Sequence, residues 1–585
     1  MKPKKHRYPF SLKALVKFYS RFSIPWWMYA VSVVLSLVYA EVMIRIAQYT
    51  ISFNKGELYN SVIIGYALLQ VLNSLIIAVR NIFDDYASLK ITFRARQVLW
   101  EKILRLPISE VDRRQPSALI SGVVNDVETA SSLMSTLFMA ISSIYAFARA
   151  IIELVRFNAK LSSYMLVLIP VAILVFTLSG QLQHKFMKRQ YASLRTMTEF
   201  FSEHISAAKH VKTQAMESRE EKAGFQAIEA RFKADVYGAF VSMVQSTSYS
   251  MYMSLDTVMT AIFGSDLIRK GQMPATGIND FNTYMSRVDQ YLAEILNEYQ
   301  TLRGTQGALQ YVGEMLDGPE EDLEAGEALL SGSGCGDLTL EHVTFGYDPA
   351  QPVLQDLSVC IPGGKITAVV GSNGSGKSTL LKLLQGVYCP DKGRILIGEM
   401  DTAKIKPVDL RRQFGYILQN NPLFSGTVRD NIAYGVQGKV RDEDVVRVAE
   451  LVDADAFIRA LPDGYDTDIG EGGKLLSGGQ RQRLAIARTL MTDPAYLLMD
   501  EAGASLDHKT DTAIFRSVRE HMKGRTIVVV AHDMRSVMEA DHIIVLDHGR
   551  LEAAGSHEEL LKSSPTYQDY LEKQGYAMIR EGTVG

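Results

Sequence analysis

Hydrophobic and polar positions divide this chain into two halves of different character. Long apolar runs fill roughly the first 300 residues, whereas the remainder alternates short apolar runs with polar segments, as a soluble α/β domain does. A bilayer core takes about 20 mostly apolar residues per helix. On that criterion the first half predicts six membrane spans, at about 25–51, 62–83, 133–155, 161–182, 237–268 and 276–296.

The last two of these spans are much more polar than the first four. Taken alone, they would also suit soluble helices. Six spans are favoured because an even number returns the chain to the side of the membrane on which it began.

Basic residues indicate the orientation in the membrane. The segments after the second and the fourth span are long and rich in Lys and Arg, including Arg94, Lys185 and Arg231, whereas the connections after the first and third spans are short. By the positive-inside rule we expect the two long segments, the N-terminus and the second half of the chain in the cytoplasm. Within the long segments, residues 111–119 and 213–220 are candidate elbows that meet the second half.

Ionisable side chains occur inside the predicted spans, where they are costly and therefore candidates for function. Glu41 and Arg45 are four residues apart, as are Arg149 and Glu153, and this spacing permits neutral ion pairs within one helix. Asp256 has no such neighbour and lies in a stretch rich in Met and Tyr, which also suits an ordinary core. The sixth span adds Asn279, Asp280, Asn282, Arg287, Asp289 and Gln290. This polarity indicates a water-filled path and a polar or amphiphilic cargo.

The most specific motif of the second half is Gly-Ser-Asn-Gly-Ser-Gly-Lys-Ser at 371–378, between an apolar strand-like run and a helical run. It matches the phosphate-binding loop G-x-x-x-x-G-K-[ST] at every fixed position. The glycines let backbone N–H groups surround phosphate oxygens, Lys377 brings positive charge to the β- and γ-phosphates, and the Ser378 hydroxyl can bind Mg²⁺. We therefore expect a nucleoside triphosphate to bind Ser372, Asn373, Gly374, Ser375, Gly376, Lys377, Ser378 and Thr379.

Four polar residues that end or follow predicted strands suit triphosphate hydrolysis. Asp500 can hold Mg²⁺ through water, and Glu501 can orient and deprotonate the attacking water. Gln419 can touch Mg²⁺ or water, and His532 can reach the γ-phosphate. Each would be weak alone, because a single Gln or His is more often structural. Together they predict a catalytic set of Glu501, His532, Gln419 and Lys377, and a metal set of Ser378, Gln419 and Asp500.

Leu-Ser-Gly-Gly-Gln at 476–480 follows the phosphate loop by about a hundred residues and shortly precedes Asp500 and Glu501. With this segment the chain resembles an ATP-binding cassette (ABC) transporter of the exporter fold, from about residue 25 to about residue 575. The resemblance implies a half-transporter: a multi-domain membrane protein in which a six-helix all-α transmembrane domain precedes an α/β P-loop ATPase domain. The expected parts are a cytoplasmic N-terminal segment (1–24), the transmembrane domain (25–310), a linker (311–336), the nucleotide-binding domain (337–575) and a C-terminal tail (576–585).

The resemblance also implies roles for individual residues. Tyr347 is expected to stack on adenine, and Asp507 belongs to a loop that crosses a dimer interface. Ser477, Gly478, Gly479 and Gln480 are expected to bind the γ-phosphate held by a second nucleotide domain. The two elbows match the coupling helices of the family. One departure is visible, because Ala502-Gly503-Ala504 stands where the family commonly has Pro-Thr-Ser, but it removes no catalytic group.

Composition adds exclusions. A formal net charge of −3 gives no general attraction to nucleic acid. Cys335, Cys360 and Cys389 have no paired spacing, so neither a disulfide framework nor a zinc site is indicated. The basic N-terminus precedes an apolar run without a small-residue cleavage site, which predicts a cytoplasmic flank of the first span rather than a removable signal peptide.

These features together predict an ATP hydrolase coupled to transport, located as an integral protein in a bacterial inner or plasma membrane. We expect ATP-driven export of a small amphiphilic molecule, lipid-like compound or peptide by alternating access, with ATP and Mg²⁺ bound. The expected partners are a second half-transporter, identical or different, the lipid bilayer and the cargo, but no nucleic acid. Import through the same fold, as in some siderophore transporters, and a regulatory half of a heterodimer stay open. The four clear spans argue against a soluble ABC ATPase that acts on DNA or ribosomes.

Overall fold

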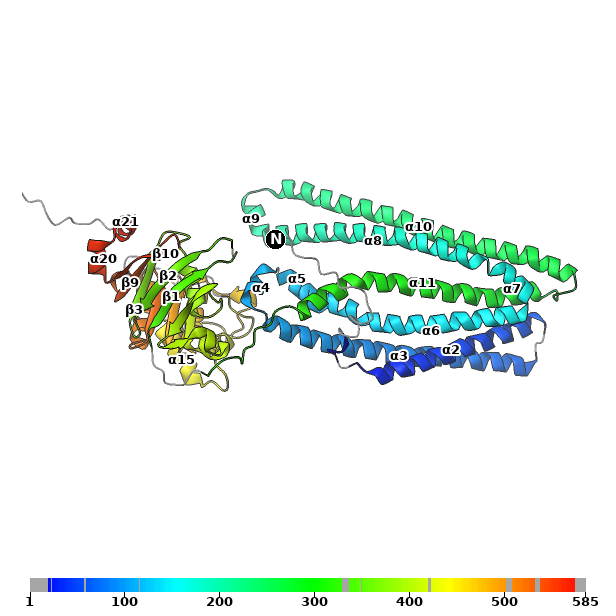
Figure 1. Ribbon diagram of the computed structural model, residues 1–585, viewed down its shortest axis with the longest axis horizontal. Helices are drawn as coiled ribbons and strands as arrows, with labels where there is room; N and C mark the ends of the chain where they lie inside the picture. The colour runs from blue at the N-terminus through cyan, green and yellow to red at the C-terminus, as the bar shows by residue number, and fades with distance from the viewer. Residues whose placement is uncertain are drawn as a thin grey trace, which may run out of the picture. The chain divides into compact units, whose positions relative to one another are not determined.

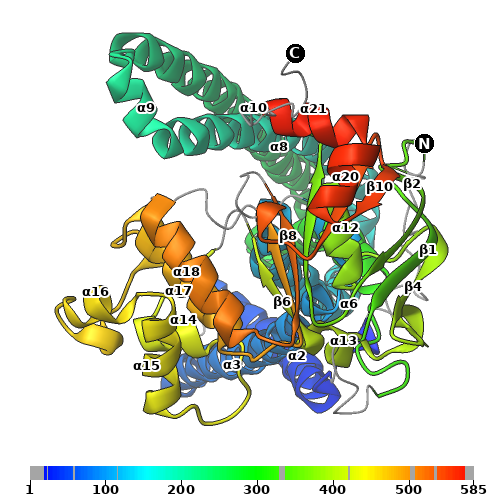
Figure 2. The same ribbon diagram turned by 90° about the vertical axis from the view of Figure 1, so that its left-hand side faces the viewer.

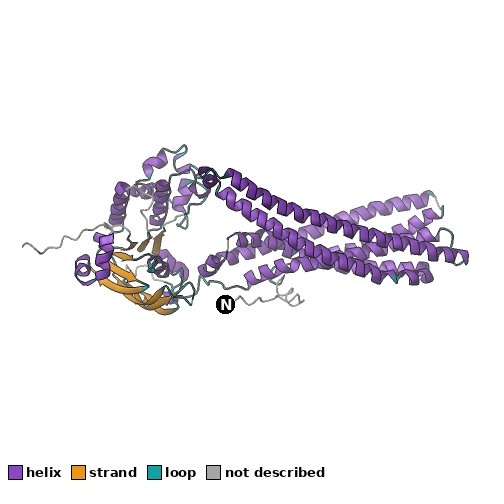
Figure 3. Ribbon diagram, turned by 90° about the horizontal axis from the view of Figure 1, so that it is seen from above, coloured by secondary structure: helices purple, strands orange, loops and turns teal. Residues whose placement is uncertain are grey.

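The structure is a computed structural model. It describes residues 19–22, 24–56, 59–114, 116–328, 336–348, 350–418, 422–500, 508–531 and 537–573. The chain divides into two compact units. The first comprises residues 1–104 and 116–318, and the second comprises residues 105–115 and 319–585. Helices alone build the first unit, and the strands lie in the second (Figure 3).

The first unit is a set of long helices (Figure 1). They are α2 (Trp26–Asn54), α3 (Asn60–Leu104), α5 (Pro116–Ser121), the π-helical turn η1 (Gly122–Asp126), α6 (Val127–Phe157), α7 (Ala159–Met165), α8 (Leu168–Ser206), α9 (Ala208–Thr213), α10 (Glu217–Arg269) and α11 (Gly277–Leu316). Several are far longer than the roughly 20 residues that span a bilayer core. For example, α3 has 45 residues and α10 has 53.

Each of the six predicted spans falls on helix. Among the described residues, four helical segments are long and apolar enough to cross a membrane: Trp26–Asn54, Asn60–Leu104, Leu119–Phe157 and Ala159–Leu182. The fourth span is divided between α7 and α8, and Pro170 lies at the third position of α8. Proline lacks an N–H group and its ring clashes with the carbonyl of residue i−4, so a break at this place has a local cause.

Helices far apart in sequence pack together within this unit. The helices α8 and α10 run side by side, and α6 packs along α11 (Figures 1 and 3). One apolar cluster joins α2, α6, α7, α10 and α11, with Phe281, Met285 and Val288 at its centre. A second cluster joins α3, α6 and the end of α11.

The second unit contains two sheets (Figure 2). The strands are β1 (Leu338–Phe345), β2 (Leu354–Ile361), β3 (Ile366–Gly371), β4 (Lys392–Ile397), β5 (Met400–Asp401), β6 (Phe414–Ile417), β7 (Tyr496–Asp500), β8 (Thr526–Val530), β9 (His542–Asp547) and β10 (Arg550–Gly555). An antiparallel sheet has the order β2-β1-β4-β5, and a six-stranded sheet has the order β10-β9-β3-β8-β7-β6. In the larger sheet all neighbours are parallel except β9 and β10.

The second unit also contains helices and helical turns. They are α4 (Ile108–Arg113), α12 (Lys377–Leu384), η2 (Thr402–Lys404), α13 (Pro407–Gln413), α14 (Val428–Ala433), α15 (Asp442–Leu451), α16 (Asp455–Arg459), η3 (Gly464–Asp466), η4 (Glu471–Gly473), α17 (Gly478–Leu490), α18 (His508–His521), α20 (His557–Ser563) and α21 (Pro565–Lys573).

The parallel strands have an apolar core on each face. Along β7, Leu497 and Met499 join one core, whereas Tyr496 and Leu498 join the other. The same alternation occurs along β3 and β8. A strand buried on both faces reads as a continuous hydrophobic run, which is why these strands stand out in the sequence. Because β3, β6, β7 and β8 are parallel, their carboxyl ends meet at one edge of the sheet, the usual ligand side of such folds.

Candidate nucleotide site and membrane helices

The phosphate-binding loop leaves β3 at that edge and leads into α12. Lys377 is the first residue of α12, and its Nζ donates to the carbonyl oxygens of Gly371 and Ser372, each at 3.0 Å. Ser372, Asn373 and Gly374 are exposed. The loop therefore presents its backbone outward beside a lysine that is only 7% exposed. A helix N-terminus with free N–H groups and a fixed cation favours an anion.

Two glycines of the loop hold positions that other residues could not. Gly376 has φ +100°, and a Cβ there would lie 2.6 Å from Cδ2 of Leu354. At Gly371 a Cβ would lie 2.1 Å from the carbonyl oxygen of Leu546. Between them, the hydroxyl of Ser375 is buried and has no hydrogen-bond partner among the described residues. A buried polar group without a partner fits a loop that is completed by a polar ligand.

Tyr347 forms a half-exposed aromatic wall beside this loop. Its hydroxyl lies 3.3 Å from Oγ1 of Thr379, and its ring meets the rings of Phe345 and Tyr388 edge to face, each at 5.3 Å between centroids. Lys382 Nζ lies 5.4 Å from the centroid of the Tyr347 ring. The ring is therefore held by neighbours while 51% of the residue stays accessible. This arrangement suits stacking of a planar base.

Asp500 ends β7 at the same edge, opposite Val530 of β8, and is 9% exposed. On the neighbouring strand β6, the hydroxyl of Tyr416 is buried close to the carboxylate of Asp500. Burial, together with the negative charge of Asp500, raises the pKa of Tyr416, so its hydroxyl stays protonated at neutral pH. Sequence reasoning missed Tyr416, although it stands in the strand that leads to Gln419.

The oxygen donors present fit Mg²⁺. Ser378 offers a hydroxyl and Asp500 a carboxylate, and no cluster of three or more His, Cys, Asp or Glu side chains occurs among the residues that the structure describes. Mg²⁺ in triphosphate sites is usually held by one or two carboxylates, phosphate oxygens and water, so a larger cluster is not required.

The Leu-Ser-Gly-Gly-Gln segment opens α17. Ser477 is its N-cap, and a reciprocal capping box joins the Ser477 and Gln480 side chains to each other's backbone N–H groups. Ser477 and Gly478 are exposed. An exposed, well-capped helix N-terminus is a suitable anion site. The role predicted for it requires the nucleotide domain of a second copy.

Four predicted site residues, Gln419, Glu501, Asp507 and His532, lie outside the described residues. The strands β6, β7 and β8 precede three of them, and their carboxyl ends lie at the same edge of the sheet as that of β3. The roles given to these four residues stay predictions.

The first predicted elbow coincides in part with α4, which belongs to the second unit. Ile108 packs against the core of the antiparallel sheet, and the hydroxyl of Tyr388 donates to the carboxylate of Asp112. Burial, aided by Asp112, raises the pKa of Tyr388, so the hydroxyl remains a donor at physiological pH. Tyr388 also touches Tyr347, and no motif in the sequence marks it.

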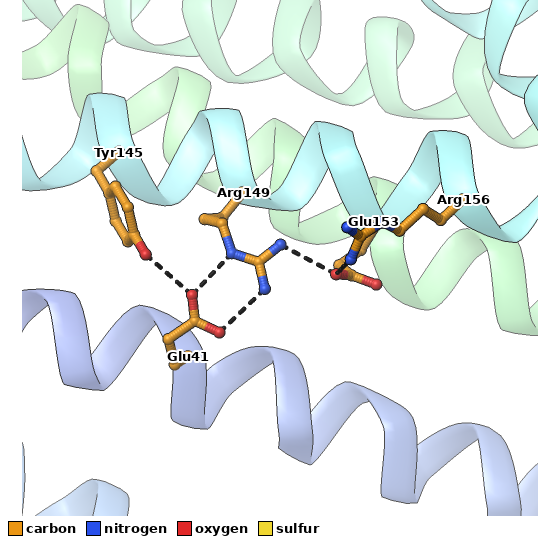
Figure 4. A network of polar contacts seen from close by, with 5 residues as sticks. All are labelled: Glu41, Tyr145, Arg149, Glu153 and Arg156. Carbon is orange, nitrogen blue, oxygen red and sulfur yellow. Dashed lines mark hydrogen bonds and ion pairs between the residues drawn. The ribbon is translucent and has the colours of Figure 1, made fainter.

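Charged side chains join two helices of the first unit (Figure 4). Arg149 on α6 donates from Nε and Nη2 to the two oxygens of Glu41 on α2, at 2.7 and 3.0 Å, and from Nη1 to Glu153 at 3.0 Å. Tyr145 donates to Glu41 and Arg156 to Glu153. The sequence predicted pairs within single helices. The structure bears this out for Arg149 and Glu153, but Glu41 of α2 pairs with Arg149 of α6 instead of with Arg45 of its own helix.

Comparison with known proteins relates both units to one family. Residues 27–289 match the family model described as ABC transporter transmembrane region, and residues 354–504 match the family model described as ABC transporter. A bacterial Atm1-family ABC exporter with ATP bound has the same fold, with a TM-score of 0.80 and 25% identity over 93% of this chain and 97% of that one.

Curated relatives agree with this match. A multidrug resistance ABC transporter ATP-binding and permease protein of Lactococcus lactis is 30% identical, over 82% of this chain and 81% of its own length. A fatty acid ABC transporter ATP-binding/permease protein of Mycobacterium bovis is also 30% identical, over 82% and 75%. The ATP-dependent lipid A-core flippase of Alcanivorax borkumensis is 30% identical, over 83% of each chain. This chain therefore belongs to the ABC transporter family, as an integral membrane half-transporter of the exporter fold that couples ATP hydrolysis to transport.

Proposed function

We propose that this protein works as a dimer that exports a small amphiphilic molecule, lipid-like compound or peptide by alternating access. The observation that carries the proposal is the similarity to an exporter along 93% of the chain. The printed names of the relatives mention multidrug resistance, a fatty acid and a lipid A core. These cargoes differ, but all three names are compatible with hydrophobic or amphiphilic molecules, which supports the class and leaves the compound open.

In the proposed mechanism, adenine stacks on Tyr347, and the triphosphate is held by the loop from Ser372 to Thr379. Lys377 exchanges its contacts with Gly371 and Ser372 for the β- and γ-phosphates. Bound Mg²⁺ would neutralise charge between the phosphates, and Ser378, Asp500 and Gln419 would hold it. Glu501 then takes a proton from the attacking water, while Gln419 and His532 sense the γ-phosphate.

A dimer follows from the placement of the two anion sites. The phosphate loop and the N-terminus of α17 are separate, exposed elements of the same unit. Each ATP would lie between the phosphate loop of one copy and Ser477 and Gly479 of another. ATP then favours the closed pair, because only that state makes both sets of phosphate contacts.

Import through the same fold is the second candidate for direction. The polar side chains of α11 that are not buried, including Arg287 and Gln290, would suit a hydrophilic cargo such as a siderophore in either direction. Export is preferred because the solved relative is an exporter.

Cells that carry either the intact chain or Glu501→Gln test the proposal. The amide retains ATP binding but cannot accept a proton, so turnover should fall by at least about a hundredfold, as expected when a general base is lost. Untargeted mass spectrometry of cells and medium then shows which compound accumulates inside the mutant cells. That compound should also enter inside-out vesicles of intact chain in an ATP-dependent manner.

Near-normal hydrolysis by Glu501→Gln would refute the role of Glu501. A compound depleted from the medium only by cells with the intact chain would instead identify an importer.

A further inference from the structure

A pair of buried carboxylates joins α10 to α11 in the first unit. Asp256 on α10 is 6% exposed, and Asp289 on α11 is 2% exposed. The hydroxyl of Tyr252, one helical turn before Asp256, donates to Oδ1 of Asp289 at 2.8 Å. The negative charge of Asp289 also acts electrostatically on the carboxylate of Asp256. The two acids and the tyrosine therefore form one cluster between the helices.

The cluster lacks bonds that buried carboxylates require. Oδ1 of Asp256 and Oδ2 of Asp289 are buried and have no hydrogen-bond partner in the part of the chain that the structure describes. Around them lies the apolar cluster that includes Tyr252, Met285 and Val288. Buried charges are ordinarily paired, and two like charges in a medium of low dielectric constant repel each other strongly. A bound positive charge would remove both costs.

Among the described side chains of α6, α7 and α11, the cations bond to other groups and none has a hydrogen bond or ion pair with Asp256 or Asp289, although Nε of Arg287 has no partner of its own. On α11, Arg287 donates to Gln290 at 3.1 Å. On α6, Arg149 is held by Glu41 and Glu153, as shown in Figure 4.

On α7, Lys160 donates to Gln272 at 3.1 Å. The first part of α8, from Leu168 to Leu182, contains no charged residue. The remaining titratable group on this face of α10 is Tyr249, which is neutral when protonated.

We propose that Asp256, Asp289 and Tyr252 form a binding site for one small monovalent cation, either H⁺ or Na⁺. The two carboxylates and the tyrosine hydroxyl offer oxygen donors from both helices, which suits either ion. Occupancy neutralises the repulsion and holds α10 against α11, and loss of the ion loosens this contact. The site links ion binding to the membrane helices and depends neither on the cargo nor on the direction of transport.

Aspartate 280 provides a matched control. It is another fully buried acid on α11, but its oxygens accept from Asn54 at 3.1 Å and from Thr276 at 3.2 Å. Because Asp280 is hydrogen-bonded, Asp280→Asn removes a buried negative charge without touching the unpartnered pair.

The test uses the full-length chain in lipid nanodiscs. ²²Na⁺ binding without nucleotide measures the sodium arm, and uptake of protons from weakly buffered medium on acidification measures the proton arm. We expect saturable binding of one of the two ions, and at least a tenfold loss of affinity in Asp256→Asn and in Asp289→Asn. Asp280→Asn should bind as the unmodified chain does. Sodium binding that competes with protons would assign Na⁺, and proton uptake that is insensitive to Na⁺ would assign H⁺.

Asp256→Glu keeps the carboxylate, so it should retain part of the ion binding that Asp256→Asn loses. This comparison separates loss of the charge from misfolding. Retained ATP hydrolysis and a normal elution volume show that each variant is folded. The proposal is overturned if neither ion binds to the intact chain. It is also overturned if the binding persists in both Asn variants or disappears equally in Asp280→Asn.

Discussion

At the scale of a single residue, the predicted role of Tyr347 depends on the side chains that hold its ring. Its ring is positioned by Phe345 and Tyr388 and carries a cation–π contact with Lys382. Stacking of a base on an aromatic ring is worth about 1–3 kcal/mol. We therefore expect Tyr347→Ala to raise the KM for ATP by about 5- to 100-fold with a smaller change in kcat.

The conservative variant separates stacking from hydrogen bonding. Tyr347→Phe keeps the ring and loses only the hydroxyl contacts with Thr379 and Lys382, so its KM should stay within about threefold of the original value. Steady-state ATPase assays at varied ATP measure both variants. An unchanged KM in Tyr347→Ala would mean that adenine lies elsewhere.

At the scale of elements, hydropathy and motifs predicted where elements lie in the chain, but they could not predict contacts between residues that are distant in sequence. Apolar runs located the first four predicted spans, and the phosphate loop stands at the end of β3 as its strand–loop–helix context indicated. The spacing of charges within one helix could not predict that Glu41 meets Arg149, 108 residues away. Tyr388 and Asp112 are 276 residues apart and belong to no motif. Such contacts depend on how elements pack, which a periodicity does not encode.

The contact between α4 and the nucleotide unit carries a prediction at this scale. Residues 105–115 connect α3 to α5 in the chain but pack with the second unit, and Tyr388 holds α4 through Asp112. We expect Tyr388→Phe to lower the amount of cargo moved per ATP by about two- to fivefold and to leave the KM for ATP nearly unchanged, because the ring against Tyr347 is retained.

A double-mutant cycle assigns this effect to the contact. Asp112→Ala should reduce transport as Tyr388→Phe does, and the double variant should be no worse than either single one. Reconstituted vesicles with parallel ATPase and uptake assays measure the ratio. Strictly additive losses would show that the two residues act independently.

For the whole molecule, the proposed dimer predicts a specific pattern of rescue. Lys377 and Ser477 belong to different elements, the start of α12 and the N-cap of α17. If each ATP lies between Lys377 of one copy and Ser477 of the other, Lys377→Ala inactivates both sites of a homodimer, and Ser477→Arg does the same. A mixed dimer places both changes in one site and leaves the other site intact. Differently tagged copies, purified through both tags, should therefore regain a large part of the activity of one site, whereas each homodimer stays at least about fiftyfold below the intact protein.

A mixed dimer as inactive as its parents would mean that one site cannot work alone or that the two residues serve the same copy. A linked dimer of one intact copy and one Lys377→Ala copy distinguishes these outcomes, because it retains one complete site in either arrangement. If this linked dimer is active while the mixed dimer is not, Lys377 and Ser477 serve the same copy; if it is also inactive, one site cannot work alone.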